Sequence, residues 1–204
     1  NVTFVYPDGE EAVLKDVSFS AKQGETIAFI GSTGSGKSTL INLIPRFYDV
    51  SCGKITVDGI NIQDYSMKEL RDKIGFIPQK AMLFTGTIAD NIRYGKEDAT
   101  DEEVIEAAKA AHVHHFVKTL PDGYNMELNE EASNVSQGQK QLLTIARAIL
   151  ADPKILILDE ATSSVDTRTE VLIQKAMDNL MEGRTSFVIA HRLSTIRRSE
   201  ERRV

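Results

Sequence analysis

ETIAFIGSTGSGKST, residues 25–39, decides how the rest of this chain is interpreted. A short run of β-forming residues, Glu25–Ile30, leads into a glycine- and serine-rich loop, and helical spacing follows in KSTLINLIPRF, residues 37–47. The loop Gly31–Ser38 fits G-x-x-x-x-G-K-[ST], in which glycines let backbone N–H groups wrap phosphates at a helix N-terminus. A chance glycine-rich turn is the alternative, but the strand–loop–helix setting disfavours it. The stretch predicts a mononucleotide site.

Two side chains of the loop and two later acids predict the chemistry. Lys37 would reach the β- and γ-phosphates, and the hydroxyl of Ser38 would hold Mg²⁺. In KILILDEATSSVD, residues 154–166, Asp159 ends an apolar strand and is placed to bind Mg²⁺ through water. Glu160 follows and is placed to orient or deprotonate an attacking water. A solvated strand end is the alternative for the acid pair, but together with the loop the two acids favour hydrolysis.

Composition limits the classes of protein that are possible. The chain has 204 residues, 41% of them hydrophobic and 26% charged, which suits one well-buried α/β domain. The net charge of −6 argues against nucleic acid as the main partner. The single cysteine, Cys52, excludes an intrachain disulfide and predicts a buried thiol in a reducing compartment. No apolar run approaches the ~20 residues of a membrane helix. The opening NVTFVYPDG reads as a strand cut partway, so we expect an excised domain.

Further apolar runs predict a parallel sheet. KIGFIP (73–78), KILILDE (154–160) and RTSFVIAH (184–191) each end in polar residues, as buried parallel strands do at the site edge of an α/β sheet. AVLKDVSFS (12–20) and GKITVDG (53–59) read instead as short antiparallel strands. The predicted fold class is α/β, a P-loop NTPase core with a mostly parallel sheet, an N-terminal antiparallel β flap and an inserted helical subdomain.

The helical subdomain is predicted from the stretch in which β signals vanish, between Thr85 and Thr144. Thr100 and Glu103 form a capping box at the start of one of its helices. We expect one domain over residues 1–204, divided into a nucleotide-binding core of residues 1–84 and 147–204 and a helical subdomain of residues 85–146.

SNVSQGQKQ, residues 133–141, holds neither an acid nor a histidine, yet it opens an apolar helix. Ser136 and Gln139 form a capping box. Capping does not explain Gly138 in the first turn, where glycine costs about 1 kcal/mol relative to alanine. We therefore expect Gly138 to let another chain approach the backbone, with the helix N-terminus offered to an anion.

Three motifs together resemble the nucleotide-binding domain of ATP-binding cassette (ABC) transporters: GSTGSGKST, NVSQGQKQ and ILILDEATSSVD, in this order. The resemblance covers nearly the whole chain. Ser136, Gly138 and Gln139 match the family signature Leu-Ser-Gly-Gly-Gln, whereas Val135 and Gln137 depart from it. The resemblance implies that the helical subdomain carries this signature, which caps the γ-phosphate held by the P-loop of a second domain in a head-to-tail dimer.

Other roles are carried over residue by residue from the same resemblance. Tyr6 matches the aromatic residue that stacks on adenine, or it packs on the hairpin. Gln79 matches the glutamine that contacts Mg²⁺ and the water. Asp166 matches a loop that crosses the dimer interface, and it can also cap the helix beginning at Thr167. His191 matches the histidine that contacts the γ-phosphate, although a lone histidine at a strand end is more often structural. The implied cofactors are ATP and Mg²⁺, and the implied nucleotide contacts are Tyr6, Gly31, Ser32, Thr33, Gly34, Ser35, Gly36, Lys37, Ser38 and Thr39, with Ser136, Gln137, Gly138, Gln139 and Asp166 at the partner.

The branch of the family is predicted from two further stretches. LFTGTIADNIRYG (83–95) resembles exporter-type domains, and Glu130 in MELNEEASN (126–134) matches a glutamate that contacts membrane helices. We expect the ATPase engine of an exporter at the cytoplasmic face of a membrane. Its partners would be a second nucleotide-binding domain, identical or different, and transmembrane domains, with neither nucleic acid nor direct membrane insertion. A soluble ABC ATPase acting on chromosomes or ribosomes, or a nucleotide-gated binding module with little turnover, remain alternatives.

Two remaining features have structural interpretations. His112 and His115 are expected to share a helical face, but no cysteine or carboxylate completes a zinc site beside them. The tail RRSEERRV (197–204) is expected to be a frayed, solvated end. It departs from the family, which continues into another strand, so we expect a missing or altered terminal segment.

Overall fold

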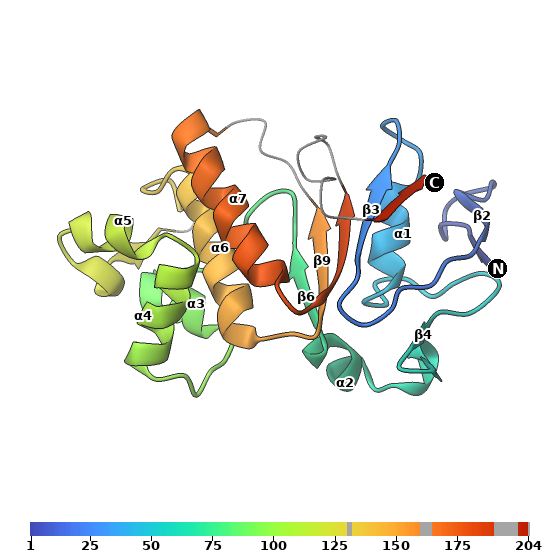
Figure 1. Cartoon of the computed structure of the whole chain (residues 1–204), viewed down its shortest axis with the longest axis horizontal. Helices are drawn as coiled ribbons and strands as arrows, with labels where there is room; N and C mark the ends of the chain where they lie inside the picture. Colours follow the sequence, from blue (N-terminus) through green and yellow to red (C-terminus); the bar gives the residue numbers. More distant parts are fainter. Residues whose placement is uncertain (130–131, 160–164, 190–199, 204) are drawn as a thin grey trace. The chain divides into compact units, whose positions relative to one another are not determined.

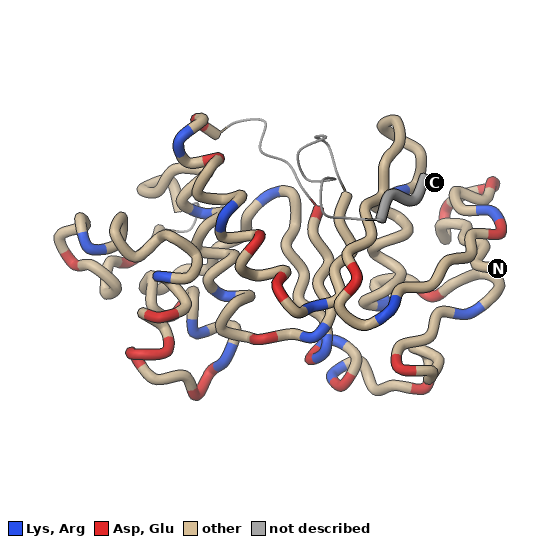
Figure 2. The backbone as a smooth tube through the Cα atoms, viewed as in Figure 1, with Lys and Arg blue, Asp and Glu red and all other residues tan. Residues whose placement is uncertain are grey.

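The computed structural model describes residues 1–129, 132–159, 165–189 and 200–203 (Figure 1). The chain divides into two compact units. The first contains Asn1–Gly75, Lys154–Asp159 and the described part of Thr185–Val204, and the second contains Phe76–Pro153 and the described part of Glu160–Arg184. Acidic and basic residues are interspersed along both units (Figure 2), as is typical of solvated surfaces. The subdomain bounds expected from the sequence stay a prediction.

The main sheet confirms the predicted parallel strands. Its order is β11-β3-β10-β9-β6 (Figure 1). Strand β10 pairs in parallel with both β3 and β9, and β11 pairs in parallel with β3. The central residues of β3, β9 and β10 are buried, which is why these segments read as continuous apolar runs. The bounds are β3 Thr26–Ile30, β6 Ile74–Ile77, β9 Ile155–Asp159, β10 Thr185–Ile189 and β11 Glu200–Arg203.

Strand β11 corrects the expectation for the C-terminal tail. Its residues, Glu200–Arg203, pair with Ile27–Ile30 of β3. A frayed end was expected because the segment is charged. Backbone pairing at a sheet edge depends on main-chain N–H and C=O groups, so the local charge does not prevent it.

Helix α1, Lys37–Leu43, is shorter than the predicted 37–47. Pro45 has no N–H to donate to the carbonyl of Ile41, so the helical ladder cannot continue through it. At the end of the helix, Ile44 N donates to the carbonyl oxygen of Ile41 at 3.4 Å, in a bond of the tighter i to i−3 type. The chain then turns, with Arg46 in the left-handed region at φ 56°.

Two antiparallel pairs accompany the first unit, as predicted. Strand β1 (Val2–Phe4) pairs with β2 (Leu14–Val17), and β4 (Thr56–Val57) pairs with β5 (Ile60–Asn61). Cys52 forms an isolated bridge with Thr3, and its thiol is exposed, so the predicted buried thiol is wrong. The bridge fixes the Cys52 backbone in a surface loop rather than in the core. After β5 come the 3-10 helix η1 (Ile62–Asp64) and helix α2 (Met67–Asp72).

The second unit is mainly helical. Thr87, Thr100 and Ser136 each cap a helix through a complete capping box, which confirms the boxes predicted at Thr100 and Ser136. Helices α6 and α7 lie side by side (Figure 1). The helices are α3 Ile88–Arg93, α4 Asp101–Ala110, α5 His114–Thr119, η2 Gly123–Asn125, α6 Gln137–Ala151 and α7 Thr167–Met181.

A small strand pair in this unit was not predicted. Strand β7 (Gly86–Thr87) pairs antiparallel with β8 (Glu127–Leu128), although β signals were expected to be absent from this region. Two-residue strands are too short to show the alternation from which strands are predicted. In the described part of the chain, no helix is both long and apolar enough to cross a membrane.

Candidate functional site

The loop between β3 and α1 has the backbone that the glycine pattern predicts. Gly34 and Gly36 have φ values of 82° and 86°, in the left-handed region that residues with a Cβ rarely adopt. A Cβ at Gly36 would also lie 2.9 Å from Leu14 Cδ2 and 3.3 Å from the carbonyl oxygen of Val13. Glycine at position 36 is therefore required both by conformation and by the closeness of the β2 segment.

Lys37 lies at the centre of this loop, with 7% of its surface exposed. Its ammonium donates to the carbonyl oxygens of Gly31 and Ser32, at 2.8 and 2.7 Å, and to Ser35 Oγ at 3.2 Å. These three partners are neutral oxygens. A largely buried cation is stabilised far more by an opposite charge, so the arrangement fits an anionic ligand such as a phosphate.

The start of α1 offers the other groups that a nucleotide needs. Gly36 is the N-cap residue and has no side chain that could accept from the first helical N–H groups. Orphan N–H groups at a helix N-terminus favour negative charge. The Ser38 side chain is exposed, as a hydroxyl that binds a magnesium ion must be, while Thr39 is 7% exposed. The chemistry of this donor set fits Mg²⁺ and a polyphosphate.

Register places Asp159 at the same edge of the sheet as the loop. Ile189 of β10 pairs with Phe29 of β3 on one side and with Asp159 of β9 on the other. Neighbouring strands are about 4.8 Å apart, so Asp159 lies about 10 Å across the sheet from Phe29. Strand β3 ends one residue after Phe29, where the phosphate loop begins. The half-buried Asp159 therefore lies at the same edge of the sheet as the phosphate loop.

Tyr6 lies between the hairpin and α1. Its ring is T-shaped against Phe4, with centroids 4.9 Å apart, and against Tyr48, with centroids 5.3 Å apart. Its hydroxyl lies 2.9 Å from Thr39 Oγ1. Tyr6 therefore packs on the hairpin and also lies next to the phosphate loop. Sequence reasoning missed Tyr48 and this hydrogen bond; the adjacent aromatics Phe47 and Tyr48 after the helix were the only signal.

The helix start at Ser136 confirms the capping box and shows a neighbour of Gly138 within the chain. Ser136 N donates to Gln139 Oε1 at 2.8 Å, and Gln139 N donates to Ser136 Oγ at 3.3 Å. Ser136 is exposed and Gln137 is half-buried. A Cβ at Gly138 would lie 2.4 Å from Thr169 Cγ2 and 2.9 Å from Val165 Cγ1. A close approach that requires this glycine is therefore made within the chain itself, and an approach by a second chain stays a prediction.

The remaining predicted site residues divide into described and undescribed ones. Asp166 caps α7, because its carboxylate accepts from Thr169 N at 3.0 Å. The same backbone hydrogen bond holds the pKa of the Asp166 carboxyl below its ordinary value. Gln79 is exposed and follows Pro78 directly after β6. The predicted base and the predicted γ-phosphate contact, Glu160 and His191, lie outside the described residues, as does Glu130.

A half-buried arginine in α6, Arg147, was not predicted. Arg147 Nε donates to the carbonyl oxygen of Asn91 at 2.8 Å, and its terminal nitrogens donate to the carbonyl oxygen of Met82 at 3.1 Å and to Asn91 Oδ1 at 3.2 Å. Its guanidinium lies 4.9 Å from the ring centre of Phe84 and 5.5 Å from that of Tyr94. Burial lowers the pKa of Arg147. In the sequence, Arg147 is one basic residue in an apolar helix and gives no such signal.

The histidines near residue 114 have structural surroundings. Helix α4 ends at Ala110 and His112 has φ 56°, so His112 and His115 do not share a helical face and that expectation is wrong. His114 Nδ1 lies 2.7 Å from the hydroxyl of Tyr124. Across the described ranges, no group of three or more His, Cys, Asp or Glu residues could hold a metal ion.

Comparison with known proteins identifies the family. Residues 14–163 match the family described as ABC transporter. The "Fatty acid ABC transporter ATP-binding/permease protein" of Mycobacterium bovis is 54% identical over 197 residues, which cover 97% of this chain and 31% of that protein. A Staphylococcus aureus protein, named "Putative multidrug export ATP-binding/permease protein", is 52% identical over 201 residues, covering 98% of this chain and 35% of that protein.

The names and lengths of these relatives bear on the alternatives that the sequence left open. The chain spans about a third of the length of the curated relatives it matches. The names of both relatives combine ATP binding with a permease, so neither a soluble ATPase acting on chromosomes or ribosomes nor a nucleotide-gated binding module with little turnover is favoured. The chain belongs to the ABC transporter family, as an ATP-binding domain of the exporter type.

Proposed function

We propose that this chain is the MgATP-hydrolysing engine of a membrane exporter, and that it works with a second nucleotide-binding domain as a head-to-tail dimer. The observation that carries the proposal is Lys37, a largely buried cation whose three described partners are neutral oxygens of the phosphate loop. Such a cation gains most from a polyphosphate ligand.

Each residue of the proposed site has a physical role. Lys37 and the loop N–H groups bind the β- and γ-phosphates, while Ser38, Gln79 and Asp159 hold Mg²⁺, which supplies charge neutralisation when bound. Glu160 accepts the proton of the water that attacks the γ-phosphorus, and ADP leaves with the electrons of the broken P–O bond. His191 contacts the γ-phosphate, and Tyr6 contacts the adenine.

The second domain would complete the site from outside. Ser136 is exposed at the start of α6, where orphan N–H groups favour a negative partner. Asp166 is exposed at the start of α7, which packs on Gly138 near the same end of α6. Because exposed polar residues begin two neighbouring helices, we propose that this surface faces the nucleotide bound by the partner domain. Reciprocal contacts of this kind give a two-fold dimer.

The permease part would dock on the second unit. Met82, Phe84 and Tyr94 have 63%, 43% and 64% of their surfaces exposed. Arg147 contacts all three residues. It donates to the carbonyl oxygen of Met82, and its guanidinium lies over the rings of Phe84 and Tyr94. Exposed aromatic and methionine side chains around an arginine are enriched in protein interfaces. The relatives carry a permease in the same chain, so we propose this patch as the contact with it, at the cytoplasmic face of the membrane.

Turnover by the purified 204-residue chain tests the proposal. We expect steady release of phosphate from MgATP. Lys37→Ala should abolish nucleotide binding, whereas Glu160→Gln should bind MgATP as the wild type does and lose about 100-fold or more in turnover. Turnover of Glu160→Gln at the wild-type rate would exclude Glu160 as the base. A wild-type chain that binds ATP but never hydrolyses it would support the binding-module alternative instead.

A further inference from the structure

Three aromatic rings beside the phosphate loop form a connected cluster, defined as Phe4, Tyr6 and Tyr48. Tyr6 stands at 80° to Phe4 and at 86° to Tyr48, and the Phe4 and Tyr48 ring centres are 5.7 Å apart. T-shaped pairs at these distances are attractive and hold ring orientation. Phe4 is 2% exposed and belongs to the core, whereas Tyr48 is 40% exposed. Tyr48 is thus the surface member of the cluster.

Tyr6 is tied to the phosphate loop at its other end. Its hydroxyl lies 2.9 Å from Oγ1 of Thr39, which is 7% exposed and follows Lys37 by two residues in α1. The ring of Tyr6 is therefore fixed at two places. Its hydroxyl is set by the helix that begins at the loop, and its tilt is set by Phe4 and Tyr48.

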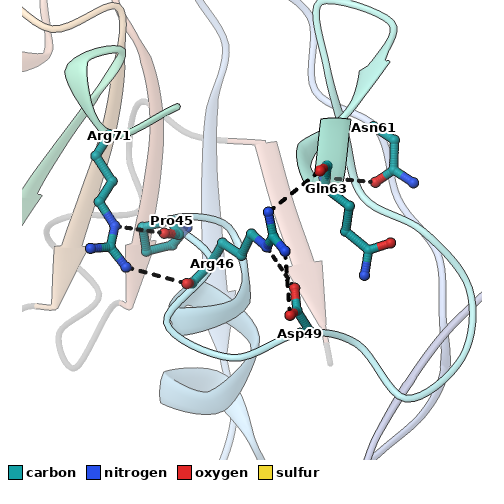
Figure 3. Close-up of polar contacts among 6 residues, drawn as sticks. All are labelled: Pro45, Arg46, Asp49, Asn61, Gln63 and Arg71. Atoms are coloured by element: carbon teal, nitrogen blue, oxygen red, sulfur yellow. Dashed lines mark hydrogen bonds and ion pairs between the residues drawn. The ribbon is translucent and has the colours of Figure 1, made fainter. Parts of the chain in front are cut away.

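The turn that carries Tyr48 is itself braced (Figure 3). Arg71 of α2 donates to the carbonyl oxygens of Pro45 and Arg46, both at 3.3 Å. Arg46 Nε donates to Asp49 Oδ1 at 2.6 Å, which closes the turn across Tyr48. A second nitrogen of Arg46 donates to the carbonyl oxygen of Gln63 at 3.5 Å. Bonds from two other segments to this turn show that it is not a free loop end.

We propose that Tyr48 is a positioning residue for nucleotide binding: it holds the ring of Tyr6 in the orientation in which that ring stacks on the base. The inference rests on the proposed function, because Tyr6 positions a base only if this chain binds ATP. Tyr48 itself makes no base contact in this account. Its effect must therefore depend on Tyr6, and it must vanish for a ligand that has phosphates but no base.

The test measures the affinity of the 204-residue chain for MgATP and for magnesium tripolyphosphate by calorimetry. Tyr48→Ala should weaken MgATP binding about 2- to 10-fold, the value of one aromatic pair, and leave tripolyphosphate binding unchanged. Tyr48→Phe keeps the ring and should bind MgATP as the wild type does. Ile60→Ala, another exposed apolar residue of the first unit (48% exposed), is the matched control and should change neither affinity.

A double-mutant cycle decides whether Tyr48 acts through Tyr6. Tyr6→Ala should cost about 10-fold in MgATP affinity, and adding Tyr48→Ala should cost nothing more. Additive losses, equal losses for both ligands, or an unchanged affinity in Tyr48→Ala would each overturn the inference, while the proposed function would stand. If the wild type bound tripolyphosphate and ATP with equal affinity, the base would add nothing to binding, and the inference about Tyr48 would be wrong. Failure of the wild type to bind either ligand would overturn the proposed function itself.

Discussion

A Cβ atom on Gly138 would lie 2.4 Å from Cγ2 of Thr169, so the first turns of α6 and α7 touch where Gly138 lacks a side chain. Alanine in place of glycine stabilises a helix by about 1 kcal/mol. Here the neighbouring side chain is β-branched and stiff, and overpacking costs about 1–3 kcal/mol. We expect Gly138→Ala to lower the free energy of unfolding by up to about 2 kcal/mol, measured by urea denaturation.

The partner substitution supplies the control for that prediction. Thr169→Ala removes Cγ2 but keeps the backbone N–H that Asp166 accepts. Gly138→Ala combined with Thr169→Ala should therefore be more stable than Gly138→Ala alone. If the second substitution gave no recovery, the contact between these two residues would not be the reason for glycine at position 138.

Arg147 should contribute strongly to the stability of the second unit. Its removal leaves the carbonyl oxygens of Met82 and Asn91 without this donor. Charge-assisted hydrogen bonds contribute about 1.5–3 kcal/mol each, and their losses overlap, so we expect Arg147→Ala to cost about 2–4 kcal/mol in urea denaturation.

Lysine is the matched control for Arg147, because it keeps the charge and loses the planar fork that reaches several acceptors. We expect Arg147→Lys to recover less than half of the loss. Full recovery would show that charge, rather than the geometry of the guanidinium, matters at this position.

We expect the cap that Asp166 forms on α7 to lose its stabilising effect at acid pH. The carboxylate accepts from the backbone N–H of Thr169, which lowers its folded-state pKa below the ordinary value of about 3.9. A lowered folded pKa means that the stabilisation is present above the unfolded pKa and is lost as the pH falls through the folded pKa.

The measurement compares the wild type with Asp166→Asn, which keeps a capping oxygen but does not titrate. The difference in unfolding free energy between the two should change between pH 5 and pH 2, in the direction of a relative loss for the wild type. A carboxyl resonance of Asp166 that titrates at or above the ordinary aspartate value would contradict the account.

Features with a local cause could be predicted from the sequence. The capping boxes at Thr100 and Ser136 each depend on residues within a few positions, and both were predicted. The parallel strands were predicted because burial on both faces leaves continuous apolar runs.

Features that join distant segments could not be predicted. The bond from Tyr6 to Thr39 spans 33 positions, and the bonds from Arg147 to Asn91 span 56. Nothing in the local sequence of either partner specifies the other. Gly138 shows the same limit: the need for glycine was visible in the sequence, but the neighbour that requires it, Thr169, became visible only in the structure.

The hydrogen bond of the Tyr6 hydroxyl changes the effect expected of Tyr6→Phe. From the sequence, Tyr6→Phe is expected to be nearly neutral, because stacking uses the ring face. The structure gives that hydroxyl a partner in Thr39. A hydrogen bond of this kind contributes about 0.5–1.5 kcal/mol, so we now expect a small but measurable loss of MgATP affinity in Tyr6→Phe.

The central claim is that Ser136 serves the nucleotide of a partner domain, and light scattering tests it most directly. Glu160→Gln with MgATP should run as a dimer, and with ADP as a monomer, because the γ-phosphate joins the two domains. Adding Ser136→Arg should abolish the dimer and leave ATP binding by the monomer nearly intact. Ser66→Arg, which removes an exposed capping-box serine at the start of α2, is the matched control and should leave the dimer in place. If Glu160→Gln with Ser136→Arg still dimerises in MgATP, or if Ser136→Arg alone destroys ATP binding, Ser136 only caps its own helix and the claim is wrong.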